Sequence, residues 1–521
     1  MSERRGPFGR LLTRALSDET LSKKASLNMV ASALDYGARV VVGLAINPLL
    51  VSRLGDVAFG VYQVLGRLIG YATPAGGRPS QALKWTIARD HYSRRYDEKR
   101  LQVGSAVAVW LLFLPLLAII GGVLAWFAPL LVAAPSSLHL AIRVAAGLLV
   151  LELIVNNLLT IPQSVLQGEN LGYKRMGLTT LVVFVGGGVT AASVLLGAGL
   201  VGVAAAAVTT TILTGAVFWW ITRAQVGWFG ITRPAMREVA GFVRLSGWFL
   251  LWNLVMQLMR GSDVVVLGIA GSAELVTVFT LARYVPEAIF EAVAIVVSGI
   301  MPGLGGLLGV RDRARAIAVR TESMCVTWVI ATASGATFLL WQESFLRLWV
   351  GEKYYPGRAA TLLIILMILQ FSFIRNDASI IDLTLKLRAK VLLGLASAGL
   401  SIGLAILLIR TWNEPIPALA LGFLAGRSIL TIGYPWLVCR FLMIPLSGQI
   451  KGAVRPGLVC AVFFFAAVVI APSLEADSWL SLVSFGGVSL MALGAAAFFL
   501  GLSPGQRRRV SMRLRQVLRR V

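Results

Sequence analysis

Long apolar stretches recur along the whole chain and are separated by short polar connections. A helix that crosses a lipid bilayer needs about 20 predominantly apolar residues. Stretches of this kind predict about fourteen membrane-spanning helices, near residues 27–52, 57–78, 102–126, 140–165, 177–197, 200–221, 245–269, 275–300, 323–341, 359–382, 391–409, 417–438, 453–471 and 480–502. No connection is long enough to fold as a separate domain, so the pattern predicts an all-α polytopic membrane protein.

The composition excludes a water-soluble globular protein. Of the 521 residues, 57% are hydrophobic and only 14% are charged, and the mean hydropathy is +0.80. Soluble proteins contain about 45–50% apolar and about 25% charged residues. The three cysteines are scattered through apolar stretches and the two histidines share no ligand spacing, so neither a disulfide framework nor a metal site is predicted.

The excess of basic residues predicts how the chain is oriented in the membrane. The sequence has 48 Lys and Arg against 24 Asp and Glu, a net charge of +24, which in a soluble protein would indicate a nucleic-acid partner. Here 35 of the 48 fall in the two tails and in alternate connections on one side, and five fall in the opposite connections. Such an excess marks the cytoplasmic side, so both termini are expected there and no nucleic acid is expected. The basic C-terminal tail either anchors this topology or binds anionic lipid.

A weak internal repeat divides the predicted helices into two halves. At an offset of 216 residues, the aligned pairs are Gly55 and Gly271, Leu65 and Leu281, Arg67 and Arg283, and Asn47 and Asp263. Repeats of this kind are a transporter arrangement, with the substrate bound between the halves in a central cavity. The predicted units are residues 1–25 (basic cytoplasmic tail), 26–222 (N-terminal six-helix half), 223–440 (C-terminal six-helix half), 441–502 (helices 13 and 14) and 503–521 (basic cytoplasmic tail).

Ionisable side chains inside the predicted helices are the main functional signal. Each charge at the bilayer centre costs about 2.5–3.5 kcal/mol, so these groups must face one another or a water-filled cavity. The basic candidates for a substrate cavity are Arg39, Arg67, Arg260, Arg283 and Arg427. The acidic candidates for ion coupling or for salt bridges are Asp35, Glu152, Asp263, Glu287 and Glu291.

The spacing of these charges divides the arginines into those with an acid nearby on the same helix and those without one. Acids close along the same helix predict salt bridges for the pairs Asp35–Arg39 and Arg260–Asp263, and Arg283 has Glu287 one turn away. Arg67 and Arg427 have no acid at helical spacing, which favours a role in binding substrate. Arginine stays charged when buried and binds phosphate groups through two parallel donors. The arginines therefore predict an anionic substrate that carries a diphosphate or a uronic acid.

A further set of charges lies close to one end of its predicted helix. Arg375, Asp377 and Asp382 are expected near the cytoplasmic rim. A long side chain at that depth reaches water with its charged end, which makes the charge less costly. These residues are therefore not expected to form the substrate cavity.

No catalytic signature appears in the sequence. A phosphate-binding GxxxxGK[ST] loop and a GxSxG nucleophile motif are both absent. The outer connections are short, and the longest, Gln342–Arg358, holds only the acids Glu343 and Glu352. Neither an enzymatic activity nor a cofactor is therefore expected.

The segment Asn47–Arg67 has the sequence NPLLVSRLGDVAFGVYQVLGR. It resembles polysaccharide exporters of the Wzx type, which belong to the multidrug/oligosaccharidyl-lipid/polysaccharide (MOP) superfamily. The similar residues are Gly55, Phe59, Gly60 and Tyr62. The resemblance implies a flippase in the cytoplasmic (inner) membrane. Such a flippase moves undecaprenyl-diphosphate-linked oligosaccharide units across by alternating access, for O-antigen, exopolysaccharide or capsule synthesis. The implied partners are the lipid-linked oligosaccharide, membrane lipids, glycosyltransferases and polysaccharide polymerase or export components.

Other functions stay open at this point. A cation-coupled multidrug exporter and a lipid II-type flippase belong to the same superfamily. A membrane glycan polymerase or ligase would place essential residues on the outer face, such as Arg347, Lys353 or Arg358. A scaffold subunit of an export complex would not depend on its buried charges.

Overall fold

The computed structural model describes residues 21–90, 93, 95–132, 134–309, 313–382 and 387–518, and these residues form helices and connections without any strand. Of the predicted basic tails, residues 1–20 and 519–521 lie outside this description. The described chain is all-α, as the apolar pattern predicts.

The number of membrane-spanning helices agrees with the prediction. Twelve segments within the described residues are long and apolar enough to cross a bilayer, and the first is Val30–Gly70. That segment contains two helices that meet at Gly55, and α9 adds a long helix at the place of the eighth predicted span. The helices are α2 (Leu21–Gly70), α3 (Pro79–Arg89), α4 (Tyr96–Leu131), α5 (His139–Gly168), α6 (Leu178–Leu195), α7 (Gly199–Gln225), α8 (Met236–Ala270), α9 (Ala273–Gly309), α10 (Arg313–Trp349), α11 (Arg358–Asp382), α12 (Leu387–Thr411), α13 (Pro415–Leu442), α14 (Leu446–Ile470), α15 (Trp479–Ala496) and α16 (Pro504–Leu518).

The aligned glycines of the repeat each mark the end of a helix. Gly55 has φ 80° and ψ 166°, a conformation that is open mainly to glycine, and it turns the chain between the two helices of α2. Gly271 ends α8, and α9 begins at Ala273. Equivalent positions of the repeat therefore carry equivalent breaks.

The second predicted span, residues 57–78, is shorter than the apolar pattern indicates. The helix ends at Gly70, a single 3₁₀ turn follows over Thr73–Gly76, and α3 begins at Pro79 within a predicted connection. Pro74 cannot donate a backbone hydrogen bond. Gly77 adopts the left-handed conformation at φ 70° and donates its N–H to the Pro74 carbonyl at 3.2 Å. Proline and glycine together break a stretch whose side chains are apolar enough for one continuous helix.

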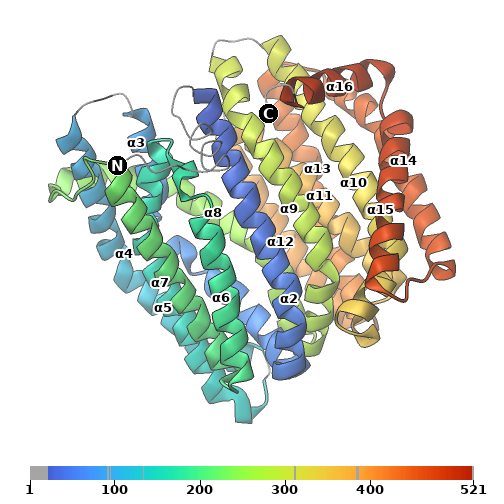
Figure 1. Cartoon of the computed structure of the whole chain (residues 1–521), viewed down its shortest axis with the longest axis horizontal. Helices are drawn as coiled ribbons and strands as arrows, with labels where there is room; N and C mark the ends of the chain where they lie inside the picture. Colours follow the sequence, from blue (N-terminus) through green and yellow to red (C-terminus); the bar gives the residue numbers. More distant parts are fainter. Residues whose placement is uncertain are drawn as a thin grey trace, which may run out of the picture.

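The helices form two groups on either side of α2. In Figure 1, α4–α7 lie on one side and α10–α15 on the other, and the beginning of α2 lies at the same end of the molecule as α16. α2 is fastened to α9, because Tyr36 donates to the Ala288 carbonyl at 2.9 Å and Tyr284 donates to the Val40 carbonyl at 3.0 Å. The packing is close, since a Cβ atom on Gly60 would lie 1.9 Å from a backbone oxygen of α9. α2 and α9 thus connect the two groups of helices.

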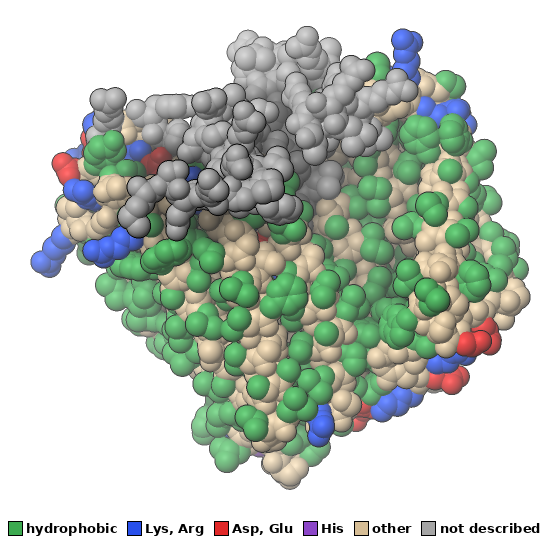
Figure 2. Space-filling view, viewed as in Figure 1, with side chains coloured by type: hydrophobic (Ala, Val, Ile, Leu, Met, Phe, Trp, Pro, Cys, Tyr) green, Lys and Arg blue, Asp and Glu red, His purple; other side chains and the backbone are tan. Residues whose placement is uncertain are grey.

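The outer surface has the polarity of a membrane protein. Hydrophobic side chains cover the middle of the face in Figure 2, whereas Lys, Arg, Asp and Glu gather at its upper and lower ends. Large exposed apolar side chains occur on several helices, for example Leu181, Phe465, Leu480 and Val483. A surface of this kind is stable in lipid and unstable in water, so the protein is a multi-pass membrane protein.

Candidate functional site

A cluster of charged side chains lies between α8, α9 and α11. Its most buried part is an ion pair between Arg283 and Asp263, with 2.7 Å from Nη1 to Oδ2. The Arg283 Nε atom also lies 3.1 Å from a carboxylate oxygen of Glu287, one turn further along α9. The side chains of Arg283 and Asp263 are 8% and 1% exposed. This arginine is therefore paired with two acids, Asp263 on the neighbouring helix and Glu287 one turn away on its own helix.

Glu291 forms the second part of the cluster. Its two carboxylate oxygens bind different arginines, Arg260 of α8 through Oε1 and Arg375 of α11 through Oε2 at 2.8 Å. The three side chains are 36% (Arg260), 30% (Arg375) and 20% (Glu291) exposed. Solvent therefore reaches this part of the cluster, in contrast to the buried Arg283–Asp263 pair.

Arg427 of α13 lies beside the cluster without an acidic partner among the described residues. Its guanidinium donates to the Met259 carbonyl at 2.5 Å. The rings of Phe423 and Phe371 lie 5.0 and 5.3 Å from the guanidinium carbon, within the range of cation–π attraction. A backbone carbonyl and two aromatic faces stabilise this buried cation without cancelling its charge.

These charges line a narrow cavity. Its wall includes Arg260, Asp263, Arg283, Glu287, Glu291, Arg375, Asn376 and Arg427. The cavity volume is about 40 Å³, which is enough for water molecules and far too small for a sugar diphosphate. In the conformation seen here, a head group enters only if the surrounding helices move apart.

Arg67 of α2 differs from its repeat equivalent, Arg283. It is half-buried and has no ion-pair partner within the described residues. A Cβ atom built on Gly261 would lie 3.4 Å from the Arg67 side chain, which places Arg67 against α8. The next turn of the chain is held to α8 by the contact between the Tyr71 and Ser262 hydroxyls, at 2.9 Å. Arg67 therefore lies where the first half meets the second.

Both same-helix salt bridges that the spacing predicts are wrong. Asp35 binds Arg175 at 2.7 Å and accepts hydrogen bonds from the hydroxyls of Thr179 and Thr180. Arg39, one turn further along α2, is exposed and has no ion pair among the described residues. The α2 helix turns Asp35 toward α6, whereas Arg39 lies on an exposed part of its surface.

The second wrong pairing concerns Arg260 and Asp263. Asp263 binds Arg283 and Arg260 binds Glu291, so both partners come from α9. The two residues are three positions apart on α8, but the acids and bases of the neighbouring helix lie closer to them. Contacts between helices therefore decide which charges pair.

Glu152 lies in a different part of the protein. It accepts a hydrogen bond from the Thr211 hydroxyl at 2.7 Å, which links α5 to α7. No basic side chain pairs with it among the described residues. The structure thus does not bring Glu152 into the cluster formed by α8, α9 and α11.

Two contributors to the charged region were not expected from the sequence. Arg375 lines the cavity, although it was expected at the cytoplasmic rim. Arg320 is buried and binds Asp377 at 2.6 Å, although it falls in a predicted connection. α10 begins ten residues before the apolar stretch does, at Arg313, and so includes Arg320. Nothing in the local sequence distinguishes Arg320 from a loop arginine, whereas Arg375 lies inside the span predicted at residues 359–382 and only its depth was misjudged.

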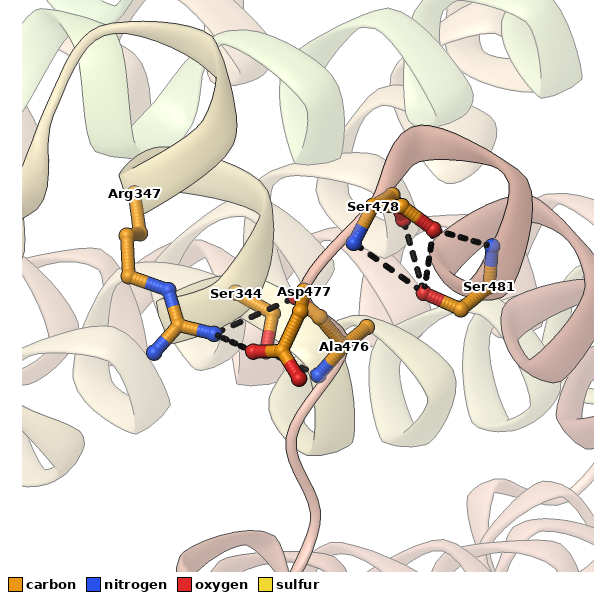
Figure 3. Close-up of polar contacts among 6 residues, drawn as sticks. All are labelled: Ser344, Arg347, Ala476, Asp477, Ser478 and Ser481. Carbon is orange, nitrogen blue, oxygen red and sulfur yellow. Dashed lines mark hydrogen bonds and ion pairs between the residues drawn. The ribbon is translucent and has the colours of Figure 1, made fainter.

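The outer cations that a polymerase would use take part in structural contacts. Arg347 donates to the Ala476 carbonyl at 3.2 Å and binds Asp477 at 3.0 Å, which fastens the α14–α15 connection to α10 (Figure 3). Lys353 binds Asp56 at 2.8 Å. The hydrogen bond to the Asp56 carboxylate raises the pKa of the Lys353 ammonium. Two of the three outer cations thus hold connections in place.

Comparisons with known proteins establish the fold. No protein-family model matches the sequence, and no curated protein matches it. The structure is similar to that of lipid II flippase MurJ in an inward closed conformation, with a TM-score of 0.67 and 12% identity over 90% of this chain and 98% of that one. It is also similar to an inward-facing multidrug resistance MATE family transporter of the MOP superfamily, with a TM-score of 0.61 and 16% identity over 84% and 98%. A MATE transporter in complex with MaD3S gives a TM-score of 0.58 and 16% identity over 82% and 97%. This chain therefore has the fold of MOP-superfamily transporters.

Proposed function

We propose that this protein is a flippase for undecaprenyl-diphosphate-linked oligosaccharide units in the cytoplasmic membrane and serves surface polysaccharide synthesis. The fold, which is similar to those of MurJ and MATE transporters, supports a flippase or exporter that works by alternating access. The position and charge of Arg67 are the observation that supports this substrate class. This cation has no carboxylate partner among the described residues and lies against α8, at the contact between the halves.

A lone arginine in this position favours an anionic ligand. Placing its charge in the membrane is costly, and no carboxylate in the described part of the chain offsets that cost. A diphosphate group would offset it through charge-assisted hydrogen bonds. The head group would then occupy the space between the halves while the undecaprenyl tail stays in the bilayer. Arg427 and the exposed Arg39 supply further cations that have no ion-pair partner among the described residues.

The acids are the proposed route for ion coupling. Asp263, Glu287 and Glu291 lie in the cavity wall, where a change in protonation would alter the number of free arginines. Asp35 is fixed by Arg175, and Glu152 lies between α5 and α7. The three cavity acids are therefore stronger candidates for coupling than the other two.

The remaining features of the proposal concern location and partners. The side that carries 35 of the 48 basic residues is assigned to the cytoplasm. Membrane lipids, glycosyltransferases and polysaccharide polymerase or export components are the proposed partners. Transport alone is proposed, without a catalytic step or a cofactor.

A multidrug exporter is the second candidate. The carboxylates of Asp263, Glu287 and Glu291 favour it, because acids in a cavity wall attract organic cations. The fold of the MATE transporters is consistent with this function to the same degree. In the drug exporter, the arginines would serve only to neutralise the acids.

Loss of the protein tests the substrate class. In cells without it, undecaprenyl-diphosphate oligosaccharide should accumulate in the cytoplasmic leaflet, and the wild-type protein should restore export. Arg67→Gln should fail to restore export at equal protein level, whereas Arg53→Gln, an exposed position near the Gly55 break, should restore it. If no lipid-linked intermediate accumulates and drug sensitivity rises, the multidrug exporter is the correct function.

A further inference from the structure

Glu291 occupies a site formed by two guanidinium groups. Arg260 of α8 and Arg375 of α11 approach the carboxylate from different helices, and each binds a different oxygen. Glu291 itself belongs to α9. One carboxylate thus pairs with two cations that line the same cavity.

The accessibility of this group distinguishes it from a structural ion pair. The side chains of Arg283 and Asp263 are almost completely buried. Those of Arg320 and Asp377 are also buried, with 8% and 4% of their surface exposed. The Glu291 carboxylate and its arginines are open to solvent at the cavity wall. A ligand in the cavity could therefore reach the two guanidinium groups that Glu291 now binds.

The chemistry of the site fits a phosphate. A carboxylate and a phosphoryl group both present paired oxygen atoms to an arginine fork, and the phosphoryl group carries more charge. We infer that Glu291 is an internal substitute for the substrate, which holds Arg260 and Arg375 in the empty transporter and is displaced by a diphosphate group. This inference rests on the function proposed above, and it names the diphosphate as the part of the substrate that these two arginines bind.

Displacement has a mechanical consequence. In the empty protein, Glu291 links α9 to both α8 and α11. When a diphosphate takes the two arginines, α9 loses both of these links, which lowers its resistance to movement relative to α8 and α11. Without a ligand, the internal carboxylate spares the protein the cost of two unpaired cations in the membrane. Substrate binding and helix movement are thereby connected through one side chain.

Binding of a short polyprenyl diphosphate to the purified full-length protein in detergent tests this inference. Farnesyl diphosphate is the probe, and farnesol is the control for the apolar chain. Glu291→Gln should bind farnesyl diphosphate at least about tenfold more tightly than the wild type, because the internal competitor has lost its charge. Glu274→Gln removes one negative charge from an exposed position of the same helix, outside the cavity wall, and should change the affinity less than about twofold.

Two further variants distinguish competition between Glu291 and the ligand from a general effect of negative charge on the affinity. Glu291→Asp keeps the charge but is one methylene shorter, so its carboxylate cannot reach both arginines. This variant should bind farnesyl diphosphate about threefold more tightly than the wild type. It tests the inference even if Glu291→Gln does not fold. Arg375→Gln, made together with Glu291→Gln, should remove the gain. The inference would be overturned if Glu274→Gln tightened binding of farnesyl diphosphate as much as Glu291→Gln does, or if neither Glu291 variant changed the affinity. If neither the folded wild type nor any variant binds the diphosphate, the proposed function itself is wrong.

Discussion

Arg283 of α9 and Asp263 of α8 form a buried ion pair, with 2.7 Å between the nitrogen and the oxygen. At the corresponding positions the first half of the repeat has Arg67 and Asn47, so the acid is missing there. One arginine of the repeat is thus neutralised within its own half, whereas the other keeps its full charge.

Removing the acid of this pair should destabilise the protein. Asp263→Asn leaves Arg283 buried with one partly exposed acid, and breaking a buried ion pair costs about 3–5 kcal/mol. The midpoint of thermal unfolding in detergent should fall clearly. Glu287→Gln is the matched control, because the Glu287 side chain is 30% exposed; its effect should be much smaller. Equal effects of the two variants would contradict the arrangement described.

A second comparison tests the partner of Asp35. The structure fixes Asp35 through Arg175 and two threonines, so Asp35→Asn should lower the unfolding temperature. Arg175→Gln should do the same, and the double variant should cost less than the sum of the single variants. Arg39→Gln should leave stability unchanged. If Arg39 and Asp35 proved to be coupled instead, the same-helix salt bridge would be restored as the correct pairing.

Close packing between α2 and α9 predicts a strong effect at one glycine. A Cβ atom on Gly60 would lie 1.9 Å from the Ala273 carbonyl oxygen, so Gly60→Ala must push α2 away from α9. Overpacking of this kind costs about 1–3 kcal/mol, and transport should fall with it. Gly66→Ala in the same helix meets nothing within 4 Å and should be tolerated. Thermal unfolding and an export assay at matched protein level measure both effects.

The C-terminal helix predicts a selective interaction with anionic lipid. Arg508 and Arg509 of α16 are exposed, whereas Arg507 donates to the Leu502 carbonyl at 3.1 Å. Each basic residue near an anionic surface contributes about 1 kcal/mol. The double variant Arg508→Gln/Arg509→Gln should therefore retain about thirtyfold less phosphatidylglycerol in detergent, as counted by native mass spectrometry. Its unfolding temperature should not change.

Arg507→Gln is the contrasting variant for this helix. Loss of its hydrogen bond to Leu502 should lower stability with little effect on lipid retention. Retention of phosphatidylcholine should be the same in all forms. If Arg508 and Arg509 prove dispensable for phosphatidylglycerol retention, the basic helix serves only to fix the topology.

Much of the architecture could be predicted from the sequence. The apolar stretches predicted about fourteen spans, and twelve segments of the described residues are long and apolar enough to cross a bilayer, because a span in lipid must be apolar over its whole length. The same pattern missed the break after Gly70, because the residues around Pro74 and Gly77 are apolar or small and only their backbone conformation ends the helix. Gly55 and Gly271 fall between predicted spans, and a helix ends at each of them in the structure.

The site was predictable only in part. The sequence identified the arginines and acids that lie inside helices. It also singled out Arg67 and Arg427 as lacking an acid at helical spacing. In the structure, neither has an ion-pair partner within the described residues. It assigned the partners of Asp35 and Arg260 wrongly and left Arg375 out of the cavity. Helical spacing describes neighbours on one helix, whereas the partners of these groups come from other helices.

The sequence by itself determined that the chain crosses a membrane many times and roughly where its spans lie, and it predicted which side carries the positive charge. These properties depend on the residues of each segment and on the bilayer. Only the tertiary structure decided that Glu291 joins Arg260 to Arg375, that Asp263 neutralises Arg283, and that Arg67 has no acid beside it in the described structure. Ion pairs form between atoms a few ångströms apart, and for these groups that distance is set by how separate helices pack.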